Sequence, residues 1–160
     1  MPSRPRLPLV VLVLSVALVV SARGRSGSDA AVQFQLANLL FEETRYGEAL
    51  EAYRKAAETD DTTISVPARI GLVRSALRIG EFTEAQREAQ TLRQMAPHNP
   101  EAMTVHADAL WSAGSFDEAE AEYRDALAAT PGMSRALHGL ARALASHNKL
   151  DDAMDAAQAG

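Results

Sequence analysis

The sequence predicts an all-α fold built from a repeated pair of short helices. Of its 160 residues, about 30 are alanine, and β-branched residues are few beyond residue 20, which favours helix over strand. Alanines recur at a spacing of 34 residues, and apolar residues recur every three or four positions between them. These observations indicate a solenoid in which each helix pair buries its apolar face on its neighbours.

The spacing is clearest in the second half of the chain. Ala85, Ala119 and Ala153 are each 34 residues apart, whereas Ala49 lies 36 residues before Ala85. Two extra residues therefore fall between the first and second copies, most naturally within 59–65. The copies predict repeats at 30–65, 66–99 and 100–133, followed by an incomplete repeat at 134–160.

Turn and capping residues mark where the paired helices begin and end. Gly80, Gly114 and Asn148 fall between paired helices, where a left-handed residue permits a sharp reversal. Asn99, followed by a proline, predicts an N-cap with proline at the first helical position. The Ser-Phe-Asp-Glu run at 115–118 predicts a capping box.

Large side chains are expected to fill the spaces between the stacked pairs. The aromatic residues Tyr53, Phe82, Phe116 and Tyr123 are predicted to belong to the core. His106 is expected to be a packed or partly buried side chain, because no second ligand stands at metal-binding spacing.

The third copy carries the most complete set of characteristic residues, which reads Met103, His106, Ala107, Leu110, Gly114, Phe116, Ala119, Tyr123, Ala126 and Pro131. This 34-residue pattern resembles the tetratricopeptide repeat (TPR) family. Departures are His106 in place of a usual leucine and Asp61 where a proline is expected. The resemblance runs from about residue 29 to the end, and it implies a right-handed α-solenoid, a TPR-like superhelix of three full repeats plus one incomplete.

The resemblance also implies a function, because the first helices of successive TPR repeats line a concave groove that binds a peptide or protein. The frame of the family places eleven residues of this chain in that groove: Phe34, Asn38, Phe41, Ile70, Arg74, Arg78, Thr104, Asp108, Trp111, His138 and Arg142. Trp111 is the expected anchor, with packing between repeats as its alternative role. Arg74 and Arg142 are expected either to pair with carboxylates of an extended ligand or to be merely solvated.

Some family members hold a terminal carboxylate with Lys, Asn and Arg on three successive first helices. Here the corresponding positions carry Phe34 with Asn38, Arg74, and Thr104 with Asp108. That clamp is not reproduced, and a chaperone-tail partner is not expected.

The first thirty residues predict export. Arg4 and Arg6 precede an apolar run at 7–20, and small residues follow at 20–22. As a helix the run reaches roughly 21 Å, short of the ~30 Å hydrocarbon core, which favours a cleavable signal peptide at 1–22 over a membrane anchor. Residues 23–29 have the composition of a flexible linker. The repeats are thus expected outside the cytoplasm, either free in the periplasm or tethered to the membrane by this segment.

Composition excludes several function classes. A net charge of −5 argues against nucleic acid, and the absence of cysteine removes disulfides and thiolate metal sites. No phosphate loop, nucleophile elbow or metal-hydrolase motif is present, so the sequence predicts neither an enzyme nor a cofactor. The incomplete last repeat favours a fragment of a longer chain. The alternatives to a binding module are therefore the accessory region of a longer exported enzyme and a membrane-tethered scaffold.

Overall fold

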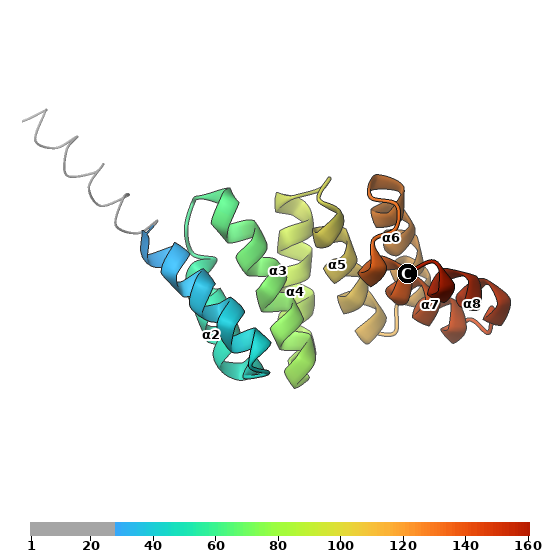
Figure 1. Ribbon diagram of the computed structural model, residues 1–160, viewed down its shortest axis with the longest axis horizontal. Coiled ribbons are helices and arrows are strands. Elements are labelled where there is room, and N and C mark those ends of the chain that lie inside the picture. The colour runs from blue at the N-terminus through green and yellow to red at the C-terminus, as the bar shows by residue number, and fades with distance from the viewer. Residues whose placement is uncertain (1–27) are drawn as a thin grey trace, which may run out of the picture.

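The described part of the chain, residues 28–160 of a computed structural model, is a row of helix pairs (Figure 1). The expected signal segment at 1–22 and most of the 23–29 linker lie outside it. The first helix covers 28–42 within the described residues. The following helices are α2 (Tyr46–Ala56), α3 (Thr62–Ile79), α4 (Phe82–Met95), α5 (Pro100–Ser112), α6 (Phe116–Ala129), α7 (Ser134–Ser146) and α8 (Leu150–Gln158). The all-α prediction is confirmed for the described residues.

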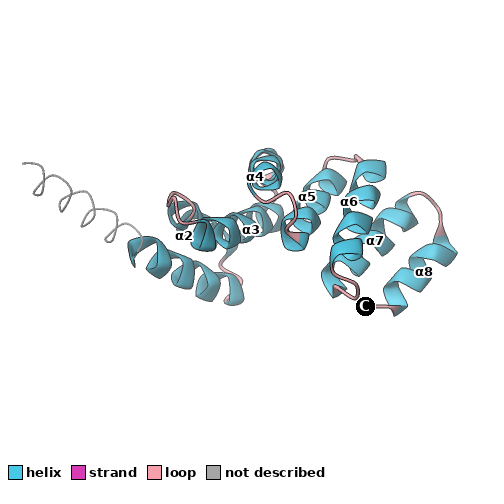
Figure 2. Cartoon of the chain, turned by 90° about the horizontal axis from the view of Figure 1, so that it is seen from above, coloured by secondary structure: helices cyan, strands magenta, loops and turns pink. Residues whose placement is uncertain are grey.

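The helices stack in chain order, as the view from above shows (Figure 2). Each helix packs on the one before it, and the first helices of neighbouring pairs also meet, α3 with α5 and α5 with α7. Within residues 28–160, no helix combines the length and apolar character that crossing a bilayer requires.

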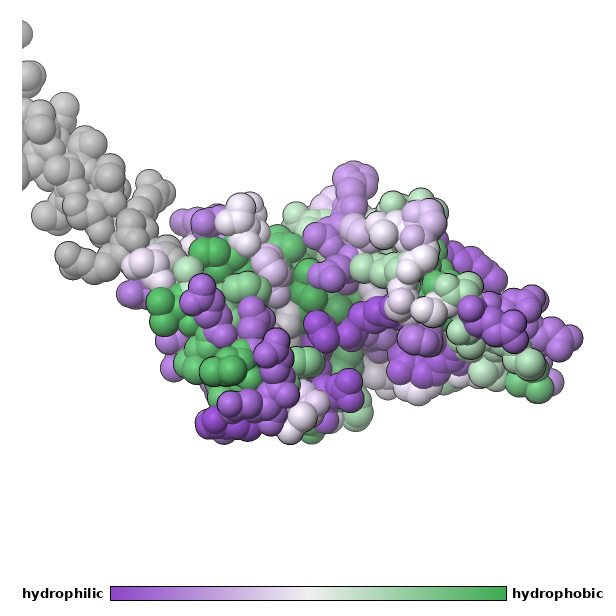
Figure 3. Space-filling model, in the orientation of Figure 1, coloured by the Kyte–Doolittle hydropathy of each residue, from purple (hydrophilic) through white to green (hydrophobic). Residues whose placement is uncertain are grey.

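The core is continuous along the array because α5 contributes to both of its halves. Val105 and Ala109 pack with the apolar residues of the first two pairs. Met103 and Ala107 pack with those of the last two. Surface apolar residues gather mainly at the N-terminal part of the face seen in Figure 3, where Val32, Leu36 and Leu39 of the first helix are exposed.

All four reversals within the pairs use the same hydrogen bond from the residue after the left-handed position. The predicted left-handed residues Gly80, Gly114 and Asn148 are confirmed, with φ of 81°, 84° and 59°. The first pair uses Thr44 (φ 61°), which the sequence did not single out. The backbone N–H groups donate back across the turn: Arg45 to Leu40 (2.9 Å), Glu81 to Ala76 (2.9 Å), Ser115 to Leu110 (3.0 Å) and Lys149 to Leu144 (3.0 Å).

The same turn geometry explains why one cap is confirmed and another is wrong. The Asn99 side chain accepts from the Ala102 N–H at 3.0 Å, as predicted. Ser115, by contrast, makes no side-chain cap. Its own N–H, which Glu118 would have satisfied in a capping box, already donates to the Leu110 carbonyl.

The two extra residues between the first and second copies form part of an additional turn of helix. The helix α3 has 18 residues, whereas α5 and α7 have 13 each. Asp61, which stands where the family has proline, caps α3 by accepting from the Thr63 N–H at 2.9 Å. Pro67 lies inside α3, where the repeat spacing places the first turn of a regular repeat helix and a missing N–H costs least.

The expected aromatic core is confirmed for the tyrosines and wrong for one phenylalanine. Tyr53 and Tyr123 are buried, and Phe116 is partly buried. Phe82 is 50% exposed, because it begins α4 at the rim of a surface pocket. His106 is partly buried, as predicted, with its side chain 13% exposed.

Candidate functional site

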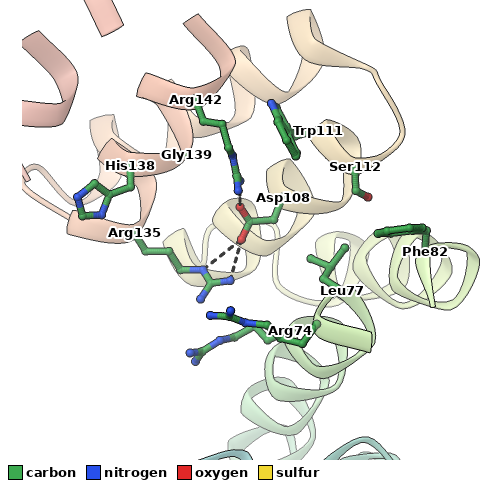
Figure 4. Close-up of a pocket in the computed structure, with 11 residues that line it drawn as sticks. Arg74, Leu77, Phe82, Asp108, Trp111, Ser112, Arg135, His138, Gly139 and Arg142 are labelled. Atoms are coloured by element: carbon green, nitrogen blue, oxygen red, sulfur yellow. Dashed lines mark hydrogen bonds and ion pairs between the residues drawn. The ribbon is translucent and has the colours of Figure 1, made fainter. Parts of the chain in front are cut away.

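A concave pocket of about 580 Å³ opens between the second, third and fourth helix pairs. Helices α3, α5 and α7 supply most of its wall, and α4 adds one residue (Figure 4). The lining residues are Arg74, Leu77, Arg78, Phe82, Asp108, Trp111, Ser112, Arg135, His138, Gly139 and Arg142.

Asp108 is the carboxylate about which the pocket is organised. Its side chain is only 11% exposed. Arg135 donates to Oδ2 from Nε (3.2 Å) and Nη2 (2.8 Å), and Arg142 donates to Oδ1 at 2.9 Å. The Tyr123 hydroxyl donates to the same Oδ1 at 2.6 Å. Burial, followed by the charge of Asp108, raises the pKa of Tyr123, so this tyrosine remains a neutral donor.

Trp111 and Arg142 form a stacked pair at one side of the pocket. The Arg142 guanidinium carbon lies 4.2 Å from the centre of the indole ring, within the range of a cation–π interaction. Arg142 also donates to the Tyr123 hydroxyl at 3.2 Å. Trp111 packs against the C-terminal half of the core while lining the pocket, so it fills both roles considered from the sequence.

Arg74 differs from the other two arginines because it has no carboxylate partner within ion-pair distance in the described chain. Its guanidinium lies 4.7 Å from the centre of the Phe41 ring, and its Nε is buried without a hydrogen-bond partner. Burial and then the neighbouring Arg135 charge lower the pKa of Arg74 from its usual range. The Arg78 guanidinium, one turn further along α3, lies 5.6 Å from the centre of the Tyr46 ring.

The structure brings six of the eleven predicted groove residues together in this pocket: Arg74, Arg78, Asp108, Trp111, His138 and Arg142. Phe34, Asn38 and Phe41 lie on the first helix, outside the pocket. There Asn38 accepts a hydrogen bond from the Tyr53 hydroxyl at 2.7 Å, and the two phenylalanines pack on the core.

Two predicted groove residues are buried and out of reach of a partner. Ile70 is 7% exposed and belongs to the core. Thr104 is completely buried, and its hydroxyl donates to the Pro100 carbonyl at 2.8 Å. Both positions turn inward because their helices are packed on two sides.

The sequence analysis missed five lining residues, and the repeat register could have found two of them. Leu77 stands 34 residues before Trp111 and 36 after Phe41, both of which were nominated. Arg135 lies one turn before His138 on the same face of α7. Phe82, Ser112 and Gly139 carry no such signal.

The pocket is chemically a cation-rich binding surface. Four guanidinium groups line it against a single carboxylate, beside the apolar surface of Leu77, Phe82 and Trp111. Among residues 28–160, no group of three or more His, Asp or Glu side chains is arranged to hold a metal ion.

Sequence and structure comparisons place this pocket in a known architecture. The tetratricopeptide repeat profile matches residues 30–63, 70–134 and 104–160. The chain belongs to the tetratricopeptide repeat family. No curated protein matches the chain in sequence.

Solved TPR structures share its superhelix. A thermophilic TPR protein of Thermus thermophilus superposes with a TM-score of 0.73 at 18% identity, covering 81% of this chain and 72% of that one. MamA gives 0.66 at 20% identity, covering 82% and 75%. The second TPR domain of human RPAP3, solved with the HSP70 peptide SGPTIEEVD, gives 0.63 at 18% identity, covering 76% and 97%. These likenesses establish a TPR superhelix of about four repeats, a fold that serves as a scaffold for binding proteins and peptides.

Proposed function

We propose that this TPR module binds an extended, acidic segment of a protein partner in the pocket lined by α3, α5 and α7. The observation that carries the proposal is the charge of that pocket, where four arginines surround one aspartate although the chain as a whole carries a net charge of −5. Positive charge concentrated on a concave surface attracts and orients anionic ligands.

Asp108 neutralises only part of this charge. It pairs with Arg135 and Arg142, which leaves Arg74 and Arg78 without a carboxylate partner. Guanidinium groups bind carboxylates through paired hydrogen bonds, and Arg74 lies partly buried, where such a bond is less exposed to competing water. An acidic side chain of the partner is therefore expected at Arg74.

The rest of the pocket suits an apolar side chain of the same segment. Leu77 and Trp111 are partly buried and Phe82 is half exposed, so together they offer an apolar wall beside the charged groups. Burying such a wall under a partner side chain is favourable by roughly 25 cal/mol per Å² of apolar surface. The proposed ligand thus combines an apolar residue with acidic neighbours.

Two similar structures support this chemistry by analogy. The RPAP3 domains were solved with the peptides SRMEEVD and SGPTIEEVD, both of which carry several acidic residues. The residues around the pocket of this chain are its own, so the proposal concerns the acidic character of the ligand and not those partners.

Fluorescence of the single tryptophan tests the proposal directly. Trp111 is the only tryptophan in the chain and lines the pocket, so titration with the peptide acetyl-EELSEE-amide is expected to change its emission. Arg74→Gln should weaken binding about tenfold, because it removes the unpaired guanidinium. The matched control is Arg87→Gln on α4, whose side chain is 68% exposed and outside the pocket. Equal affinities for both variants, or no binding to the native chain, would contradict the proposal.

We also propose that the module acts outside the cytoplasm. The support is the sequence of residues 1–22, with two arginines before an apolar run and small residues at its end. Mass spectrometry of the protein recovered from its native cells should find an N-terminus at Arg23. An intact N-terminus in the membrane fraction would indicate an anchor, and intact protein in the cytosol would contradict export.

A further inference from the structure

The tips of Arg74 and Arg135 lie next to each other across the pocket, although both carry positive charge (Figure 4). Arg74 comes from α3 and Arg135 from α7, and α5 lies between these helices in the stack. The proximity has an electrostatic effect, because the charge of Arg135 is among the causes that lower the pKa of Arg74. Two like charges held together in this way mark a place that is short of negative charge.

Both guanidiniums are fixed by contacts that leave donors free. Arg135 uses Nε and Nη2 for Asp108, and no partner of its Nη1 is present in the described chain. Arg74 is held by its contact with the Phe41 ring, and its Nε has no partner. Arginines that are already oriented lose little conformational freedom when they bind an anion.

We propose that the space between Arg74 and Arg135 binds the phosphoryl group of a phosphorylated serine or threonine in the partner segment. A carboxylate brings one negative charge, whereas a phosphoryl group carries about −1.5 to −2 at neutral pH and three acceptor oxygens. The larger charge and the additional acceptors match two converging guanidiniums, with Arg78 one turn from Arg74 as a third cation. This inference rests on the proposed function and specifies its ligand.

The form of the pocket favours a phosphoryl group attached to a protein over free phosphate. A free ion would leave the apolar wall of Leu77, Phe82 and Trp111 uncovered, in a pocket of about 580 Å³. A peptide can occupy the anion site and cover that wall at once. The segment is therefore expected to place an apolar residue next to the phosphorylated one.

Three matched peptides and inorganic phosphate provide the test. The probes are acetyl-EELSEE-amide, the same peptide with phosphoserine, and the same peptide with glutamate in place of serine, each titrated into the full chain and followed by Trp111 fluorescence and calorimetry. The phosphoserine form should bind at least about tenfold more tightly than either other peptide. Inorganic phosphate should compete only at much higher concentration.

Substitutions separate the anion site from the rest of the pocket. Arg135→Gln and Arg74→Gln should each remove most of the gain due to phosphorylation, whereas Arg87→Gln on α4 should retain it. Circular dichroism checks that each variant stays folded, and Arg78→Gln, more exposed on α3, provides a third variant that should reduce the gain in part.

The outcomes distinguish this inference from the proposed function. If the serine and phosphoserine peptides bind equally and Arg74→Gln weakens both, the phosphoryl site is refuted while acidic-segment binding stands. If free phosphate binds as tightly as the phosphopeptide, the protein-borne source is refuted. If no peptide binds, both proposals fail.

Discussion

The side chain of Tyr123 in α6 packs directly on the backbone of Gly139 in α7, so closely that a Cβ on residue 139 would overlap the phenol ring. The hydroxyl of this ring then reaches Asp108 in the pocket. The same contact occurs between Tyr53 and Gly71 in the first half of the array, where the hydroxyl reaches Asn38. A structural contact between repeats thus also positions a pocket residue.

Replacing Gly139 with alanine should therefore destabilise the protein. The added methyl group has no space unless the Tyr123 ring moves, and overpacking of this kind costs about 1–3 kcal/mol. Urea denaturation followed by circular dichroism measures the change. The control is Gly47→Ala in α2, where nothing lies within 4 Å of the new Cβ and the substitution should stabilise by about 0.5–1 kcal/mol. If both variants shifted stability alike, the steric account of Gly139 would be wrong.

Thr44→Gly should stabilise the chain. Thr44 is a β-branched residue held at φ 61°, a conformation that costs about 1 kcal/mol or more outside glycine, and the equivalent positions are Gly80 and Gly114. We expect a gain of about 1 kcal/mol in the free energy of unfolding. The reciprocal variant Gly114→Thr should lose a similar amount, and thermal unfolding of both variants checks the pair. A loss of stability in Thr44→Gly would show that the threonine makes a compensating contact.

Acid should weaken the junction between α4 and α6 through Glu122. Burial alone would raise the pKa of Glu122, but the neighbouring His106 and Arg93 hold it below its ordinary value. Arg93 Nε lies 3.0 Å from Oε2, and the His106 Nδ1 lies 3.5 Å from Oε1. Because the folded pKa is depressed, the stabilisation is complete above the unfolded value of about 4.3 and is lost as pH falls through the folded value.

Urea denaturation at pH 7, 5, 4 and 3 tests this sign. The native chain should lose more stability between pH 5 and 3 than Glu122→Gln, which has no charge to lose at this position. Glu118→Gln, an exposed acid on the same helix, should follow the native chain. An identical pH dependence for all three proteins would remove Glu122 from the account.

Trp111→Ala should weaken partner capture more than Phe116→Ala once stability is corrected. Trp111 lines the pocket and stacks under Arg142, whereas Phe116 lies behind it with its ring centre 6.0 Å from the indole. Loss of the indole removes an apolar contact of about 2 kcal/mol and frees the guanidinium that it orients. Calorimetry with the acidic peptide compares the two variants. The reverse order would show that Trp111 serves mainly packing.

The fold was predictable from sequence because each repeat shows the same local chemistry. The spacing of Ala85, Ala119 and Ala153, together with the left-handed residues at the turns, specifies helix pairs without reference to distant contacts. The capping box at Ser115 failed because the turn hydrogen bond had already used the backbone N–H. Such competition depends on the exact path of the turn, which composition does not encode.

The site was predictable only in part, for a related reason. Repeat register identifies which residues share a face, and six of the eleven nominated residues do line the pocket. It does not determine burial, and Thr104 and Ile70 share the nominated face but lie buried where neighbouring helices pack closely. Nor does it reveal ion pairing across repeats, such as Arg135 with Asp108, which depends on side chains reaching between helices 27 residues apart.

The tyrosine–glycine contacts also govern how this array could be rearranged. At the positions between Tyr53–Gly71 and Tyr123–Gly139 stand Ala89 and Val105, both completely or almost completely buried, so large and small partners exchange places from one junction to the next. Excising residues 100–133 would bring Ala89 opposite Gly139 and leave a hole, while joining the first copy directly to the third would drive Tyr53 into Val105. Recombination that preserves this chain's packing must therefore add or remove copies two at a time.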